Sequence, residues 1–206
     1  MRDNYMDCPD RERAQWWGDE VNELGEAFYA LSPSGQKLAV KGIHELMNWQ
    51  REDGTLYAPV PAGNWDKELP LQMLASIGWY GFYTQYYYSA DSSFVPVIYD
   101  RMRRYLHEVW QVDKSGLVIE RQGAWSWGDW GEHVDMGVLT NCWYYLALKA
   151  ERAFALQLGK DKDADEISRM MRSIERCFDT KFWTGSAYRS PGYKGETDDP
   201  SQAMAV

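Results

Sequence analysis

The sequence predicts an all-α protein made of helical hairpins, whose long loops gather at one end of an (α/α) toroid. Three observations support this fold class. Apolar residues recur at helical spacing, the helical segments are joined by loops rich in Gly and Pro, and those loops carry Trp and Asp. In such a toroid the helices form the scaffold and the loops form a pocket. A helical solenoid is the alternative, but solenoid repeats usually have a more regular length and shorter loops.

Six predicted helices and the start of a seventh follow one another along the chain. Helical spacing of apolar residues, interrupted by turn residues, gives the ranges 9–31, 34–49, 65–88, 92–112, 135–158, 163–178 and from about 200 onward. The helix over 65–88 is apolar nearly all round, so we expect it to be buried on several sides. A short extended segment is expected at 117–119. Paired in order, the helices form about three hairpins and the beginning of a fourth.

The composition argues against several classes of partner. The net charge is -9 at pH 7, and no run of Lys and Arg is present to contact nucleic-acid phosphates. No apolar run is long enough to span a membrane. The three Cys and three His lack metal-ligand spacing, so we expect neither a metal nor another cofactor. Eleven Trp and fourteen Tyr exceed what packing usually requires, and such rings often line sugar-binding sites.

The stretch over 7–20 carries the strongest chemical signal. Pro9 suits the first turn of a helix, so we expect a helix to begin here. Glu12, Trp16 and Asp19 then stand at i, i+4 and i+7 on one face. An indole between two carboxylates suits proton transfer to a glycosidic oxygen, because the ring can stack on a sugar and desolvate the acid. The alternative is a solvated acidic first turn that complements the helix dipole.

A second cluster lies at 125–130, where the sequence reads Trp-Ser-Trp-Gly-Asp-Trp. Three indoles beside a Gly and an acid predict a platform for a sugar ring. The alternative is a Trp-rich loop that packs over the rim of the barrel. Trp65 and Asp66 lie at the same end of the preceding hairpin, although Asp66 is equally suited to cap its helix.

The segment over 7–19 resembles the signature of the bacterial α-L-rhamnosidases of glycoside hydrolase family 78, commonly written D-C-P-x-R-[D]-E-R-x-x-W-x-G-D. The chain matches it at Asp7-Cys8-Pro9, Arg11, Glu12-Arg13, Trp16 and Gly18-Asp19. It lacks the frequent extra Asp before Glu12, whereas the spacing from Glu12 to Asp19 is unchanged. Gly-Asp-Trp at 128–130 resembles a loop of the same family, and Trp65-Asp66 resembles its Trp-Gly-Asp stretch without the Gly.

This resemblance implies part of a six-hairpin (α/α)6 toroid that releases terminal α-L-rhamnose from glycosides or polysaccharides with inversion. It makes Glu12 the general acid. The residues that it assigns to sugar binding are Asp7, Arg11, Trp16 and Asp19, with Glu20, Trp65, Asp129 and Trp130 as outer candidates. The general base, a Glu on a later hairpin of the family, is expected beyond Val206. A hard cation bound by the acids at 7–20 is an alternative that the neighbouring indoles argue against.

We therefore expect residues 1–206 to be the N-terminal portion of a larger catalytic domain, cut at both ends. The chain opens on the signature and closes within what reads as an apolar helix. Such a portion should be inactive alone and should expose apolar helix faces, which would bind the remainder of its own domain or a second copy. Because the family is often exported, the parent enzyme is expected in the periplasm or outside the cell, with the cytoplasm as the alternative.

Two other functions fit the same residues. Another six-hairpin glycosidase would share the toroid and the acids but act on a different sugar. A non-catalytic carbohydrate-binding or scaffold protein made of helical hairpins would bind sugars without turnover.

Overall fold

Helices make up every regular element in the part of the chain that the computed structural model describes, which is residues 3–61, 66–121, 124–128 and 130–206. The all-α prediction is therefore confirmed. The elements are α1 (Trp17–Ala30), α2 (Ser34–Asn48), α3 (Pro70–Ile77), α4 (Phe82–Ser89), α5 (Val95–Arg104), the π-helix η1 (Tyr105–Val109), α6 (Met136–Gln157), α7 (Asp161–Phe182) and α8 (Asp199–Ala205).

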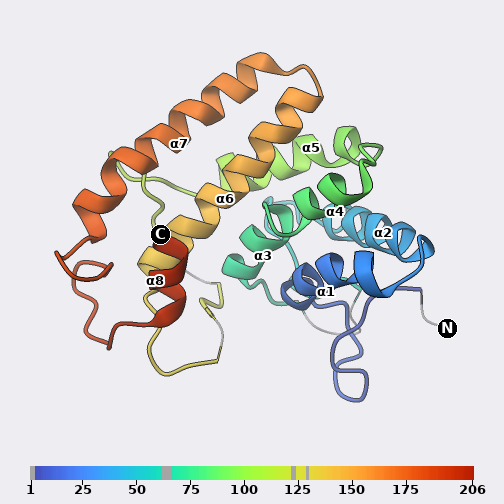
Figure 1. Ribbon diagram of the computed structural model, residues 1–206, viewed down its shortest axis with the longest axis horizontal. Coiled ribbons are helices and arrows are strands. Elements are labelled where there is room, and N and C mark those ends of the chain that lie inside the picture. Colours follow the sequence, from blue (N-terminus) through green and yellow to red (C-terminus); the bar gives the residue numbers. More distant parts are fainter. Residues whose placement is uncertain (1–2, 62–65, 122–123, 129) are drawn as a thin grey trace.

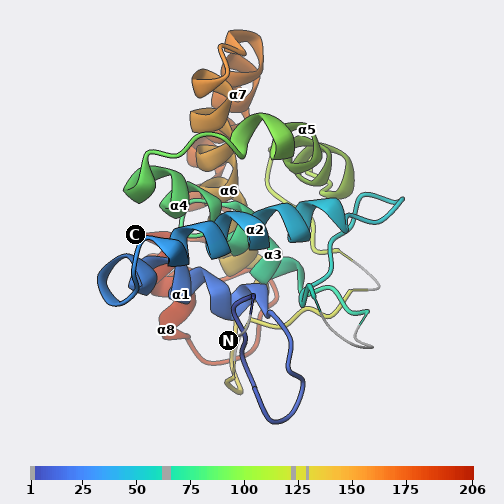
Figure 2. The same cartoon turned by 90° about the vertical axis from the view of Figure 1, so that its right-hand side faces the viewer.

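Two of the expected hairpins form in the described chain, whereas α5 packs mainly against α2 and α6 rather than against α3 or α4. α1 packs against α2, and α6 against α7, as the chain order predicts. Figure 1 shows α6 and α7 side by side on the left of the molecule. Figure 2 shows α1 and α2 side by side. α6 also packs against α3, α5 and α8. Between η1 and α6, the expected extended segment at 117–119 forms one bridge, from Val118 to Val112.

The first helix begins later than the sequence predicts. α1 starts at Trp17, so the expectation of a helix from residue 9 is wrong. Pro9 instead takes the second position of a turn, in which the amide of Arg11 donates to the carbonyl of Cys8 at 3.2 Å. Proline fixes a backbone angle that suits a turn as well as a helix start, and the sequence pattern cannot distinguish the two. Glu12, Trp16 and Asp19 therefore do not share one helix face.

The helix predicted over 65–88 is two helices, broken between Ile77 and Phe82. α3 starts at Pro70 and buries seven of its eight residues, as expected for a helix inside the bundle. α4 buries Phe82 and Gln85 but exposes much of its tyrosine-rich C-terminal end. The break follows from Gly81, where a Cβ would lie 1.8 Å from the carbonyl oxygen of Ser76.

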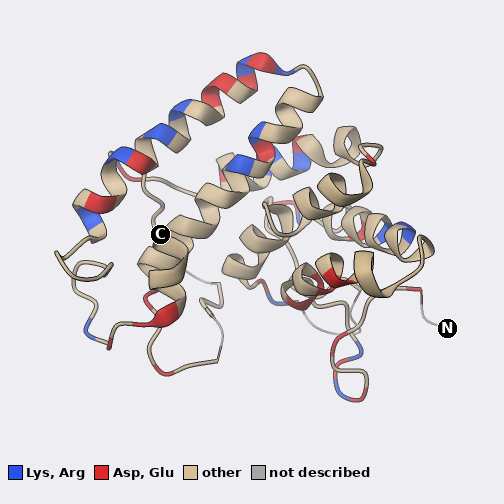
Figure 3. Ribbon diagram, in the orientation of Figure 1, with Lys and Arg blue, Asp and Glu red and all other residues tan. Residues whose placement is uncertain are grey.

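The helices differ in how much charge they carry. Trp17 at the start of α1 is fully buried and packs edge-on against Phe82, with ring centroids 5.6 Å apart. Figure 3 shows both signs of charge along α7, whereas α3 and α4 contain no Asp, Glu, Lys or Arg. None of the described helices combines the length and apolarity needed to cross a membrane.

We expect Gly81→Ala to destabilise the fold by on the order of 3 kcal/mol, because the added methyl group meets backbone rather than a movable side chain. Gly25→Ala in α1 is the matched control, since its Cβ would meet nothing within 4 Å. The control should be stabilised by roughly 0.5–1 kcal/mol through helix propensity. Urea denaturation measures both changes. Equal effects of the two substitutions would contradict the packing described at Gly81.

Candidate functional site

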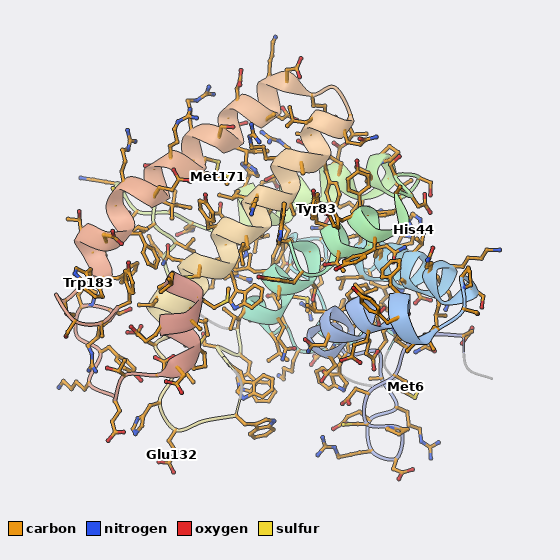
Figure 4. All side chains as sticks on the ribbon, viewed as in Figure 1. Met6, His44, Tyr83, Glu132, Met171 and Trp183 are labelled. Atoms are coloured by element: carbon orange, nitrogen blue, oxygen red, sulfur yellow. The ribbon has the colours of Figure 1, made fainter. Side chains whose placement is uncertain are left out.

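A cavity of about 360 Å³ lies between the N-terminal loop and the Trp-rich segment over 125–130. Its lining residues are Asp7, Cys8, Arg11, Glu12, Trp16, Asp19, Leu69, Gln72, Trp125, Trp127 and Trp130. Two clusters that are far apart in the sequence are thus brought together. Figure 4 shows Met6 and Glu132, which mark the two loops, on the same side of the helices.

The loop over 7–14 carries Glu12 in a strained backbone. The amide of Asp7 donates to the carbonyl of Ala14 at 3.2 Å and closes the loop. Cys8 and Arg13 have positive φ angles of 48° and 53°, a conformation that costs roughly 1–2 kcal/mol per non-glycine residue. Strain of this kind persists where the surrounding structure requires it and is often found at functional sites. The loop is therefore held in a defined shape rather than left as a connector.

Polar contacts within the loop set the protonation of its side chains. The thiol of Cys8 donates to Oδ2 of Asp7 at 2.7 Å, and Nη2 of Arg11 donates to the sulfur at 3.3 Å. The bond to Asp7 favours the neutral thiol and raises the pKa of Cys8 to about 11. Nε of Arg11 pairs with Oε1 of Glu12. Hydrogen bonding with Cys8 and then with Arg11 lowers the pKa of Glu12, so its carboxyl is ionised at neutral pH.

Two polar atoms of cavity residues are buried without a partner among the described residues. They are Oε2 of Glu12 and Oε1 of Gln72. The side chain of Gln72 packs directly over Gly18. A Cβ at Gly18 would lie 2.3 Å from Cδ of Gln72. The glycine of the signature thus makes room for an amide. Buried polar atoms are normally satisfied, so these two oxygens are suited to bind a polar ligand.

Three indoles form the opposite wall of the cavity. The ring centroids of Trp125 and Trp127 are 6.0 Å apart, and those of Trp127 and Trp130 are 5.3 Å apart at 77°. Trp130 is 86% exposed and Trp125 46%, so both rings reach the surface of the protein. Exposed indole faces beside carboxylates suit a ligand that has both C–H surfaces and hydroxyl groups.

A buried ion pair fixes the chain that leads into this wall. Arg121 donates through Nη1 and Nη2 to the two oxygens of Glu68, each at 2.8 Å. The hydroxyl of Tyr105 donates to the same carboxylate at 2.8 Å, and the guanidinium lies 5.2 Å from the ring centroid of Trp110. Such a bidentate, fully bonded pair gives a defined geometry. The pair joins Glu68, next to the cavity residue Leu69, to Arg121, which precedes the Trp cluster over 125–130.

The structure does not bring every predicted site residue to the cavity. Glu20 is fully buried between α1 and α2, away from the cavity lining. Burial, together with Glu23 and Glu45, raises its pKa to about 9. Trp65 and Asp129 lie outside the described residues. In the described part of the chain, no group of three His, Cys, Asp or Glu side chains is arranged to hold a metal ion.

Comparison with known proteins identifies the fold. The family model described as the bacterial alpha-L-rhamnosidase 6 hairpin glycosidase domain matches residues 1–205. The chain belongs to this family. A search of curated proteins found no significant match.

Three solved structures have the same fold as this six-hairpin glycosidase chain. A rhamnosidase from Klebsiella oxytoca with rhamnose bound is 18% identical, with a TM-score of 0.84 over 100% of this chain and 40% of that one. An alpha-L-rhamnosidase from Dictyoglumus thermophilum is 21% identical, with a TM-score of 0.75 over 91% and 21% of the two chains. A GH78 family rhamnosidase of Bacillus sp. GL1 is 21% identical, with a TM-score of 0.77 over 91% and 20%. The chain thus spans between a fifth and two fifths of these proteins.

Family membership confirms the toroid prediction and removes the solenoid alternative. It does not rest on the helical alignment of Glu12 with Trp16, which is wrong. Sequence reasoning missed Leu69 and Gln72 as cavity residues, because both lie in a segment read as a continuous apolar helix. The sequence does contain one signal for Gln72. Gly18, within the signature, is a residue type that allows another side chain to approach the backbone closely.

We expect Asp7→Asn to speed alkylation of Cys8 at pH 8. Loss of the carboxylate removes the contact that favours the neutral thiol, which lowers the pKa of Cys8 and increases the thiolate fraction. Iodoacetamide labelling followed by mass spectrometry measures the rate. Cys142, whose pKa burial raises to about 12, is the internal control and should label slowly in both proteins. An unchanged Cys8 rate would exclude Asp7 as the cause.

Proposed function

We propose that this chain is part of an α-L-rhamnosidase that hydrolyses terminal α-L-rhamnosides. The observation that carries the proposal is the cavity itself, in which Glu12 and its loop face three indoles from the other half of the chain. Family membership and the rhamnosidases of the same fold support the substrate class. The residues of this cavity offer an acid, a cation and aromatic faces, which together suit a sugar rather than a phosphate or a peptide.

Glu12 is our candidate for the general acid. Its Oε2 has no described partner, whereas the carboxylate of Asp7 already accepts the Cys8 thiol. A general acid must carry a proton, yet Arg11 and Cys8 hold Glu12 ionised in the absence of substrate. We infer that a bound sugar displaces Arg11 and excludes water from the carboxyl, and both changes raise the pKa of Glu12.

The remaining cavity residues would bind the sugar. Trp16, Trp125 and Trp130 offer ring faces to the C–H groups of the deoxy sugar, and Asp7, Arg11, Asp19 and Gln72 offer partners to its hydroxyls. Trp65 and Asp129 remain candidates on the basis of the family resemblance alone. An inverting reaction also needs a general base about 6.5–9.5 Å from Glu12 across the sugar, so that water fits between them. We assign that base to a part of the enzyme outside residues 1–206.

We further propose that this chain is the N-terminal portion of its catalytic domain. Two open grooves, of about 460 and 430 Å³, share Tyr80 and are lined by residues of α1, α4, α6, α7 and α8, many of them apolar. The rest of the same domain would cover them, or a second copy where the rest is missing. The complete enzyme is proposed to work in the periplasm or outside the cell.

In the complete enzyme, we expect Glu12→Gln to lower turnover of rhamnosides with poor leaving groups by about 10²–10⁴-fold, because the amide cannot protonate the departing oxygen. The loss should be smaller with an activated aryl leaving group, and rhamnose should still bind. Glu132→Gln is the control, since Glu132 lies on the outer part of the second loop and does not line the cavity. Turnover close to the unmutated rate on both substrates would remove Glu12 from this role.

We expect Arg11→Met to shift the alkaline limb of the kcat/KM profile to higher pH. The acid must be protonated, so activity falls as pH rises through the pKa of Glu12. Removing the adjacent guanidinium raises that pKa and extends activity upward. The profile on an aryl α-L-rhamnoside measures the shift, and a panel of other aryl glycosides tests the alternative of a different sugar. If the alkaline limb of the profile stays at the same pH, or moves to lower pH, a group other than Glu12 determines it.

A further inference from the structure

Glu20 is the buried acid for which the proposed reaction has no use. Its side chain is fully buried in α1, and neither carboxylate oxygen has a hydrogen-bond partner among the described residues. A lone buried carboxylate without partners is costly, because it loses its hydration and gains nothing in return. We therefore expect this carboxyl either to be protonated or to have a hydrogen-bond partner.

A second buried oxygen without a partner approaches the same point of α2, at Gly42. Oε1 of Gln15 is also buried without a partner. A methyl group at Gly42 of α2 would lie 3.1 Å from this oxygen and 3.2 Å from Oε1 of Glu20, so both oxygens converge on one point of the helix. Two oxygens that can only accept cannot bond to each other. One proton on the carboxyl satisfies both.

The orientation of the Gln15 amide is fixed independently. Its Nε2 donates to the carbonyl of Val60 at 2.5 Å and to Oε2 of Glu45 at 3.3 Å. Since a backbone carbonyl can only accept, the nitrogen must face Val60. The amide oxygen is left facing Gly42 and Glu20. A flipped amide would place two acceptors against each other at Val60.

We propose that Glu20 is a positioning residue that, as a neutral carboxylic acid, donates a hydrogen bond to Oε1 of Gln15 and so holds the segment over 14–17 against the loop over 58–61. That segment contains Trp16, which lines the cavity, and it directly follows the loop over 7–14. The effect on sugar binding rests on the proposed function. The hydrogen bond itself does not.

Burial and the acidic residues on α1 and α2 favour the neutral form of Glu20. Glu23 lies on the same helix, and Glu45 faces it from α2, where Lys41 binds Glu45 at 2.8 Å. α3 and α4, which also pack on α1, contain no acidic or basic residue. Tyr5, whose own pKa is raised to about 12, completes the group. Among the described residues, Lys41 on α2 is paired with Glu45 and is not among the groups that shift the pKa of Glu20.

Infrared difference spectroscopy of the full chain tests the proposal directly. At pH 7 the unmutated chain should show the C=O stretch of a protonated carboxylic acid, and Glu20→Gln should remove that band. Gln15→Met deletes the acceptor, so the band should persist but move to higher frequency. Glu26→Gln, an exposed acid on the same helix, should change neither. A spectrum in which Glu20→Gln removes no acid band overturns the proposal, and a band unmoved by Gln15→Met overturns the hydrogen bond.

The pH dependence of stability gives a second, independent readout. The pKa of Glu20 is about 9 in the folded chain and 4.5 ordinarily, so between these values the folded state holds a proton that the unfolded state releases. This group alone should lower the folding equilibrium constant by up to about tenfold per pH unit across that window. Glu20→Gln should flatten the slope, and Glu26→Gln should not. An unchanged slope in Glu20→Gln contradicts a buried neutral acid.

Rhamnose binding, followed by tryptophan fluorescence, separates this proposal from the proposed function. In the complete enzyme, if the unmutated protein binds rhamnose, Gln15→Met should weaken binding by about tenfold and Glu20→Gln, which can still donate, by less than threefold. Equal losses would overturn the positioning role. If the unmutated complete enzyme binds no rhamnose, the proposed function loses support, while the infrared and stability measurements still decide the state of Glu20.

Discussion

The backbone pairing of residues 14–17 with the loop over 58–61 is the constraint on which the site depends. The backbone amide of Gln15 donates to the carbonyl of Pro61 at 3.1 Å, and its carbonyl accepts from the amide of Val60 at 3.0 Å. The amide of Trp17 donates to the carbonyl of Ala58 at 3.0 Å. These bonds use backbone groups that a continuing helix would need for itself. The chain before Trp17 therefore cannot be helical, and it folds out as the loop that carries Glu12. A helix from residue 9 would remove this wall of the cavity.

The same loop connects the two walls of the cavity. The amide of Ala58 donates to the carbonyl of Lys67 at 3.0 Å, and the next residue, Glu68, holds Arg121 in a bidentate pair. A continuous set of hydrogen bonds thus runs from the acidic loop to the segment before the Trp cluster. Loops far apart in the sequence are held in one arrangement by buried polar groups whose partners are specific, rather than by apolar packing alone.

Helix identity was predictable where periodicity was long and uninterrupted. α6 and α7 begin and end within a few residues of the predicted ranges, because their apolar stripes repeat over several turns and Asp135 caps the start of α6. The break between α3 and α4 was not predictable from pattern alone. It depends on the close approach of Gly81 to the backbone of Ser76, a tertiary contact that leaves no periodic trace. The Trp cluster was found from composition, but its distance from Glu12 required the fold.

The two glutamates of the signature region show why geometry must come before pKa in assigning an acid. Glu20 has the raised pKa that is usual for a general acid, and Glu12 has a lowered one. A search by pKa would choose Glu20. Yet Glu20 is enclosed between two helices and does not line the cavity, whereas Glu12 does. A proton donor must come within hydrogen-bond reach of its target, and its pKa can be adjusted by the ligand that it meets. The raised pKa of Glu20 is then a consequence of burial in the scaffold, and the lowered pKa of Glu12 reflects its contacts with Cys8 and Arg11 in the loop.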